Sequence, residues 1–187
     1  MAQEATTTRS VAERIRRVRQ EPRRRHLQVL RVEVLSPHVR GITFGGDDLA
    51  DFASHAFDDH VKVFLPVAEG DAPVVRDYTP RRFDTEQREL CIEFALHGEG
   101  PAARWAQAAR PGDRLVVGGP RGSFIVPDDL GWYLLVGDSS SLPAVLRRLE
   151  ELPATTRVQA IVQMDREDQR SLPAAAQGRL QWVPDVV

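Results

Sequence analysis

The sequence is poor in the features that cross-link a chain or anchor it in a membrane. Of its 187 residues one is a cysteine, Cys91, so an intramolecular disulfide is excluded and a reducing compartment suits the chain. No uninterrupted apolar run approaches the roughly 18 residues of a membrane-spanning helix. The N-terminus also lacks the apolar core of a secretory signal. We therefore expect a cytoplasmic protein without a membrane partner.

Lysine and metal-ligating clusters are scarce too. Lys62 is the one lysine among 25 basic residues. The residues His55, Asp58, Asp59 and His60 form the one cluster of metal-ligand types, but no further ligand is spaced to close a coordination shell. We predict no metal site there, because the same residues suit a turn and the start of a strand.

Arginine, in contrast, is concentrated at the N-terminus. Residues 1–26 contain eight arginines and three glutamates, although the whole chain has a formal net charge of -2. Ser10 and Glu13 form a capping-box pair, and apolar residues then recur at helical spacing, so we predict a helix over residues 10 to 20 that ends before Pro22. We interpret this arm as a solvated helix with a basic linker rather than a nucleic-acid-binding arm.

Two apolar patterns divide the remaining chain. From residue 26 to residue 117, apolar and polar residues alternate over about six short stretches, as in antiparallel strands with one buried face. From Trp132 the pattern becomes a continuous apolar run, typical of a strand buried on both faces of a parallel sheet. A helix over about residues 144–152 and strands over residues 158–164 and 180–183 are predicted to follow.

The stretch from Arg76 to Asp84 places unusual chemistry at the end of a strand. In an extended strand Arg76 and Tyr78 share a face, Thr79 turns away, and Pro80 then blocks further pairing. A guanidinium suits a phosphate, a phenol ring can lie against a flat ring system, and a hydroxyl can bond a ring nitrogen. Flavin dinucleotide meets all three demands, whereas the motif alone also fits an edge strand with solvated arginines.

A second element is suited to phosphate. The segment after His97 leaves a strand through glycines and places Pro101 at a first helical position, which exposes backbone amides at a helix start. The loop from Gly118 to Ser123 has too little side-chain bulk for a core element.

Five segments, taken in order, resemble one protein family. Arg76-x-Tyr78-Thr79 resembles the flavin-binding strand of the ferredoxin reductase superfamily, and its extension to Asp84 resembles the FAD-dependent siderophore-interacting proteins. The other segments that resemble this family are Asp59 to Lys62, His97 to Trp105, Gly119 to Ser123, and Gly137 to Pro143, in which Ser139 replaces the family's glutamate.

The resemblance implies FAD as the cofactor. Arg76 is then expected to bind the flavin phosphates, Tyr78 and Thr79 the isoalloxazine and ribityl region, and Lys62 an anionic substrate. The implied cofactor contacts are Arg76, Tyr78, Thr79, His97, Gly100, Pro101, Ala102, Ala103, Trp105, Arg121, Gly122, Ser123, Asp138 and Ser140.

The fold class expected from the patterns and the resemblance is β plus α/β. An N-terminal antiparallel Greek-key β-barrel of about six strands, which binds FAD, precedes a truncated parallel α/β unit of nucleotide-binding type. The expected boundaries are residues 1–25 for a basic helical arm, 26–127 for the barrel and 128–187 for the α/β unit. A small three-stranded sheet leaves an apolar face and a free edge, so we expect a homodimer or a reductase partner through residues 132–187.

The implied function is ferric-siderophore reduction, in which NAD(P)H reduces FAD and FAD reduces the ferric chelate. Because the α/β unit is shorter than the roughly 100 residues of a self-contained dinucleotide domain, the use of NAD(P)H stays open. One alternative is a flavin-binding scaffold that works with a partner reductase or in non-redox small-molecule chemistry. The other is an arginine-rich module that binds nucleic acid.

Overall fold

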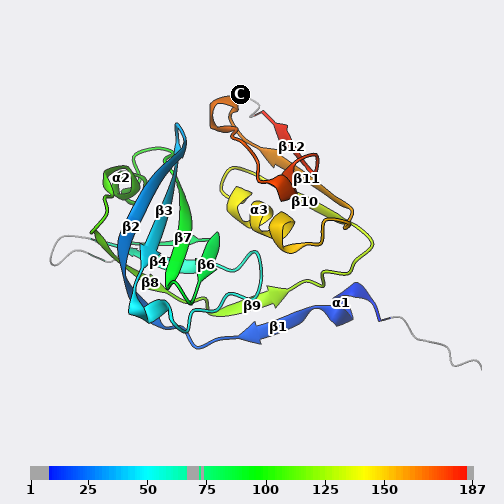
Figure 1. Cartoon of the computed structure of the whole chain (residues 1–187), viewed down its shortest axis with the longest axis horizontal. Helices are drawn as coiled ribbons and strands as arrows, with labels where there is room; N and C mark the ends of the chain where they lie inside the picture. Colours follow the sequence, from blue (N-terminus) through cyan, green and yellow to red (C-terminus); the bar gives the residue numbers. More distant parts are fainter. Residues whose placement is uncertain (1–8, 67–71, 73, 185–187) are drawn as a thin grey trace, which may run out of the picture.

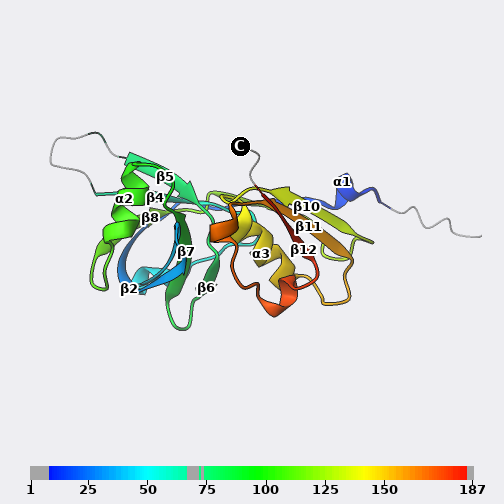
Figure 2. The ribbon, with the colours of Figure 1, turned by 90° about the horizontal axis from the view of Figure 1, so that it is seen from above.

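Two units lie side by side, a curled antiparallel sheet and a smaller parallel sheet, with a helix between them (Figures 1 and 2). The structure, a computed structural model, describes residues 9–66, 72 and 74–184. Within those residues the larger sheet has seven strands. In spatial order they are β5 (Val74–Tyr78), β4 (Val61–Leu65), β8 (Arg114–Gly118), β2 (Arg24–Ser36), β3 (Val39–Gly45), β7 (Glu89–Ala95) and β6 (Arg82–Asp84).

The alternating sequence pattern forms the core of this sheet. In β7, Leu90, Ile92 and Phe94 are fully buried, and the residues between them face outward, as the period of two requires. The helix α2 (Pro101–Ala108) packs Ala102 and Ala106 against the same core. The insertion of β8 between β4 and β2 gives the sheet a Greek-key order, so the expected antiparallel barrel is confirmed.

The strand β6 is the additional strand that the sequence did not predict. Pro80 ends β5 as expected, but the chain then crosses to the opposite edge of the sheet, where Arg82 pairs with Cys91 of β7. β5 and β6 are therefore the two edge strands, and the Pro80 corner joins them. Local alternation did not reveal a three-residue strand whose pairing depends on this distant neighbour.

The predicted N-terminal helix is wrong beyond its first turn. The capping box of Ser10 and Glu13 is present, but α1 (Val11–Arg14) buries no residue, so packing does not extend it. The chain instead forms β1 (Arg16–Arg19), which pairs with β9 (Gly122–Ile125). Gly122 permits the approach, since a side chain there would come within 2.7 Å of the Val18 carbonyl oxygen.

The second unit is a parallel sheet that α3 covers. Its strands β10 (Tyr133–Gly137), β11 (Val158–Gln163) and β12 (Leu180–Val183) pair in that order, and α3 (Leu142–Glu151) connects the first two. Leu146 and Leu149 of α3 pack on Ala160 and Val162 of β11. Single 3-10 turns occur at η1 (Asp47–Leu49), η2 (Arg166–Asp168) and η3 (Ala174–Ala176).

The other face of this sheet is open to solvent. Trp132, Leu134 and Val136 are 64%, 51% and 69% exposed. The prediction that this run is buried on both faces is therefore wrong. The helix α3 covers one face of the sheet, and no element within the described residues covers the other. The expected apolar face of the sheet is present. Within the same residues, no helix is long and apolar enough to cross a membrane.

Candidate functional site

A cleft between the two units collects the central predicted residues. It has a volume of about 460 Å³ and lies at the carboxyl ends of β10 and β11, the edge where open α/β sheets bind ligands. Its lining residues come from both units: Val39, His60, Arg76, Asp77, Tyr78, Thr79, Glu93, Ala95, Ser139, Ser140, Leu142, Pro143, Met164 and Arg170. Arg76, Tyr78, Thr79 and Ser140, four of the candidate cofactor contacts, thus line one cleft, although Ser140 lies about sixty residues beyond the other three.

The strand β5 presents Arg76 and Tyr78 on one face. Its antiparallel register with β4 places them opposite the inward-facing Val63 and Val61. The Tyr78 ring packs on Phe94, with 4.4 Å between ring centroids, and burial raises the pKa of its phenol. The phenol is therefore a neutral hydrogen-bonding group at physiological pH, held rigidly against the barrel core.

Arg76 stays accessible to a ligand. Its Nη1 donates to the Val75 carbonyl oxygen at 2.9 Å, and the side chain is exposed at the wall of the cleft. A guanidinium fixed by its own strand and facing solvent can bind a phosphate through two parallel N–H groups.

The start of α2 is open, as a phosphate site requires. Gly100 is the N-cap without a side-chain capping bond, and a methyl group added there would meet nothing within 4 Å. Pro101 occupies the first turn, Ala102 and Ala103 are buried, and Trp105 stacks on Phe44 with 6.2 Å between centroids. Trp105 and the alanines therefore anchor the helix on the barrel, while the space at its N-cap, Gly100, stays open.

The turn after β10 is ordered by Asp138. Its Oδ1 accepts from the Ser140 hydroxyl at 2.7 Å, from the Ser140 amide at 3.0 Å and from the Ser141 amide at 3.1 Å. These bonds, that of the Ser140 hydroxyl first, hold the pKa of Asp138 below its ordinary value. His97 lies 3.4 Å from the Ser139 hydroxyl, so this barrel residue contacts the same turn. Asp138 thus fixes the conformation of the turn, and Ser139 and Ser140 line the cleft.

The glycine loop lies elsewhere. Arg121 is exposed, Gly122 allows β1 to approach, and the buried Ser123 hydroxyl donates to Asp59 Oδ2 at 2.7 Å. None of the three lines the cleft among the described residues. Lys62 is on the outer face of β4, where its Nζ donates to Asp77 at 2.8 Å. Through Asp77, a cleft residue, Lys62 borders the entrance rather than the interior.

Several cleft residues were missed as ligand candidates, among them His60, Glu93 and Arg170. His60 was considered only within a metal cluster, and Glu93 and Arg170 contain no local motif. Arg170 forms an ion pair with Glu93 across the two units, and its Nη1 is buried without a hydrogen-bond partner in the described residues. The position of His60, two residues before the candidate substrate residue Lys62, was a sequence signal for a site residue. The pairing of Glu93 with Arg170 has no such signal, because it depends on tertiary structure.

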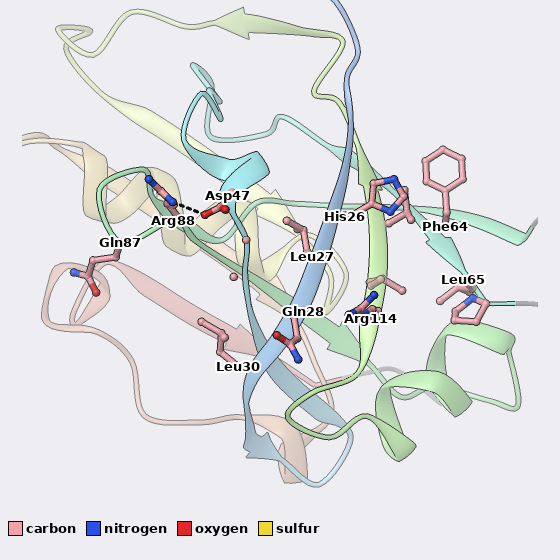
Figure 3. A pocket seen from close by; sticks show the side chains of 15 residues that line it. His26, Leu27, Gln28, Leu30, Asp47, Phe64, Leu65, Gln87, Arg88 and Arg114 are labelled. Atoms are coloured by element: carbon pink, nitrogen blue, oxygen red, sulfur yellow. Dashed lines mark hydrogen bonds and ion pairs between the residues drawn. The ribbon is translucent and has the colours of Figure 1, made fainter.

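A larger cavity of about 830 Å³ shares no residue with the cleft (Figure 3). His26, Phe64 and Arg114 line it on β2, β4 and β8, and an Arg88–Asp47 ion pair lies on its other side. Size alone would select this cavity. The cleft is the better candidate site because residues Arg76 to Thr79 of the barrel and the turn that carries Ser139 and Ser140 in the α/β unit both line it.

The fold is of the ferredoxin reductase type. A ferredoxin-NADP+ reductase from Plasmodium falciparum superimposes with a TM-score of 0.66 at 13% identity over 86% of this chain and 73% of that chain, which is a likeness of fold. A siderophore utilization protein from T. fusca superimposes with a TM-score of 0.84 at 34% identity, over 91% of this chain and 72% of that chain.

Sequence comparisons narrow this class to a family. The model of the siderophore-interacting FAD-binding domain matches residues 28–74 and 67–124, and that of the siderophore-interacting protein matches residues 130–186. The chain belongs to the siderophore-interacting FAD-binding family, and its barrel is an FAD-binding domain.

Two curated relatives are longer than this chain. The NADPH-dependent ferric-chelate reductase of Escherichia coli is 44% identical over 153 residues, which cover 73% of this chain and 60% of the relative. The ferric vibriobactin reductase ViuB of Vibrio cholerae is 31% identical over 178 residues, which cover 85% of this chain and 66% of the relative. The chain thus spans about two thirds or less of their length.

The residues present fit FAD. The cleft offers an accessible guanidinium, an aromatic ring fixed on the core and the hydroxyls of Thr79 and Ser140, and its volume lies within the roughly 300 to 1,000 Å³ of ligand pockets. The open space before Gly100 leaves room for a phosphate at the start of α2.

Proposed function

We propose that this chain uses FAD, bound in the cleft, to reduce a ferric chelate. The observation that supports this most directly is the convergence of Arg76, Tyr78 and Thr79 with the serine turn of the α/β unit on one cavity. The names of the curated relatives, which are ferric-chelate and ferric vibriobactin reductases, support the same substrate class.

The chemistry divides between cofactor and protein. When bound, FAD accepts a hydride from a nicotinamide and releases single electrons, which is the conversion that a ferric chelate requires. Reduction weakens the chelate, because ferrous iron has a lower charge than ferric iron and binds hard oxygen ligands less strongly. The protein binds and orients the cofactor. Arg76 and the start of α2 bind its phosphates, Tyr78 and Thr79 contact its ring system, and Ser140 contacts it from the α/β unit.

Absorbance and anaerobic mixing test this function. The purified chain, supplied with FAD and then desalted, is expected to retain a visible flavin spectrum that NADPH bleaches without oxygen, and a ferric siderophore is expected to restore it. Flavin that dithionite bleaches but NADH and NADPH do not would favour a scaffold served by a partner reductase. A chain that retains no flavin would contradict both readings and leave the nucleic-acid module.

Lys62 is proposed to attract an anionic ferric chelate. The expected result of Lys62→Ala is a KM for that substrate about tenfold higher, the effect of losing one charged hydrogen bond, with an unchanged thermal midpoint. Stability is insensitive because Lys62 and Asp77 are 41% and 50% exposed, and such surface pairs contribute about 1 kcal/mol or less. Asp77→Ala is the control, since it frees the ammonium group; an equal rise of KM in both variants would contradict the assignment.

We also propose that a second copy of the chain covers the open face of the parallel sheet. Leu134 and Val136 of β10 and Trp132, which directly precedes the strand, are exposed apolar side chains that are costly to leave in water. Val136→Glu is expected to convert a dimer to a monomer in light scattering at micromolar concentration. Val34→Glu, at a valine 71% exposed on the barrel, is the control and should leave the mass unchanged. A wild-type chain that is monomeric at that concentration would refute the dimer.

The proposed location is the cytoplasm. Cys91 is a free thiol, and burial raises its pKa, so it is an unreactive group that needs no oxidising compartment. Fractionation of cells with an antibody against the chain tests this, and recovery from a secreted fraction would contradict it.

A further inference from the structure

A buried arginine of α3 reaches from the α/β unit into the barrel. Arg147 is 6% exposed, and its Nη1 donates to the Ser54 hydroxyl at 2.7 Å and to the Pro80 carbonyl oxygen at 3.1 Å. Its Nη2 donates to the Ser54 carbonyl oxygen at 2.9 Å. One guanidinium therefore holds two barrel segments, and Pro80 directly follows the Arg76-to-Thr79 wall of the cleft.

Ser54 extends this contact to a third segment. Its hydroxyl donates to Asp59 Oδ2 at 2.9 Å, and the same oxygen accepts from the Ser123 hydroxyl at 2.7 Å. Asp59 is 3% exposed and directly precedes His60, a cleft residue. The segments around Pro80, His60 and Ser123 are thus joined through one buried network that begins on α3.

Glu150, one helical turn from Arg147, binds Arg81 and Arg82, the two residues that follow Pro80. Its carboxylate accepts from Arg81 at 2.6 and 2.9 Å and from Arg82 at 2.7 Å. Two side chains of one helix therefore fix three consecutive residues, 80 to 82. In both views α3 lies beside β6, the strand that starts at Arg82 (Figures 1 and 2).

We propose that Arg147 is a positioning residue for the flavin, so that the α/β unit sets the geometry of the cofactor site independently of any nicotinamide role. This inference rests on the proposed use of FAD in the cleft. Arg147 touches no ligand; it acts by fixing the Pro80 carbonyl and, through Ser54 and Asp59, the segment that presents His60. The cleft walls formed by Thr79 and His60 therefore keep their separation only while α3 is docked.

The neighbouring Arg148 provides a matched control. It has the same exposure of 6% and also donates to two carbonyl oxygens, those of Val126 and Pro127, at 3.2 and 2.7 Å. Those residues belong to the segment between the units and do not line the cleft. Arg148 also lies over the ring of Phe57, 5.2 Å from its centroid, so the two variants are compared over residues 79–82, where Arg147 bonds the Pro80 carbonyl oxygen.

The experiment compares Arg147→Gln with Arg148→Gln in the full chain. Hydrogen exchange of the flavin-free chain is expected to speed up about tenfold over residues 54–60 and 79–82 in Arg147→Gln, the effect of losing a buried charged bond. In Arg148→Gln it is expected to stay at the wild-type rate over residues 79–82. The Kd for FAD is expected to rise about tenfold in Arg147→Gln alone, with an altered visible circular dichroism of the bound flavin. Arg147→Lys, which retains the charge and a donor, should restore part of both effects.

The outcomes separate the two proposals. A wild-type chain that binds no FAD would end the proposed function, and with it the cofactor role of Arg147, while the exchange data would still show whether Arg147 holds the cleft segments. Equal exchange or equal FAD affinity in Arg147→Gln and Arg148→Gln, at matched thermal midpoints, would overturn the positioning role. If Arg147→Gln does not fold, the same comparison is made with Arg147→Lys and Arg148→Lys.

Discussion

Replacing Arg76 by alanine is expected to weaken FAD binding about a hundredfold while leaving the fold intact. A guanidinium that binds a phosphate through two charged hydrogen bonds contributes about 3 kcal/mol, and each 1.4 kcal/mol is a factor of ten in Kd. The fold should survive, because the Arg76 side chain is exposed and donates its hydrogen bond to the carbonyl oxygen of the neighbouring Val75. Titration of flavin fluorescence gives the Kd, and desalting shows the loss of yellow colour directly.

Arg31→Ala is the matched control for this prediction. Arg31 is also an exposed strand arginine of the barrel, and its two donors bind Glu89 at 3.0 and 2.8 Å, away from the cleft. The Arg31→Ala substitution removes the same charge from the same sheet but no residue of the cleft, so the variant's Kd for FAD should equal that of the wild type. If both variants weaken FAD equally, general charge and not the Arg76 contact explains the effect.

The second large effect is expected on stability, from Glu150→Ala. Arg81 is 4% exposed and both of its terminal nitrogens donate to Glu150, whereas Glu93, 3.4 Å from Nε, makes no hydrogen bond with it. Removing one partner of a buried ion pair leaves an uncompensated charge and costs about 3 to 5 kcal/mol. Urea denaturation should therefore show a free energy of unfolding lower by about 3 kcal/mol.

The neighbouring Glu151 is the control for Glu150. Glu151 lies on the same helix and binds Arg147 at 2.7 Å, but its side chain is 39% exposed and its partner also binds Ser54 and Pro80. Glu151→Ala should cost about 1 kcal/mol or less, as exposed helical pairs do. Equal losses in the two variants would mean that the Arg81 pair is no more than a surface ion pair.

The Glu150 contribution has a defined pH dependence. Burial by itself would raise the pKa of this carboxyl, but the hydrogen bonds from Arg81 and Arg82 outweigh burial and hold the pKa below the ordinary value of 4.5. A lowered folded-state pKa stabilises the fold above pH 4.5, and the stabilisation is lost as the pH falls through the folded value. The difference in unfolding free energy between wild type and Glu150→Gln should be constant near neutral pH and should shrink as the pH falls below 4.5.

The sequence identified the residues whose role depends on local geometry. Alternation along β5 placed Arg76 and Tyr78 on one face, and glycine followed by Pro101 located the helix start, because both features depend on a few consecutive residues. The capping box of α1 was also correct, but the helix beyond it was not, since the alternative pairing partner β9 lies about a hundred residues further along the chain.

The interactions that depend on distant segments could not be predicted. The apolar spacing of α3 predicts its packing on the parallel sheet, but an arginine on such a helix is usually solvated, and nothing local shows that Arg147 is buried. Ser123 resembled a ligand contact by its loop, and its actual hydroxyl partner, Asp59, precedes it by 64 residues. Such polar networks are specified by the assembled fold.

The Pro80 corner connects cofactor binding to the closure of the barrel. The strands on its two sides, β5 and β6, are the opposite edges of one seven-stranded sheet within the described residues, so the flavin motif lies on the line where the curled sheet meets itself. In the proposed site, a ligand bound to Arg76 and Tyr78 would contact β5 at this line, beside the corner that leads to β6. If FAD binds there, it would raise the free energy of unfolding of the barrel, because it binds the folded chain and not the unfolded one.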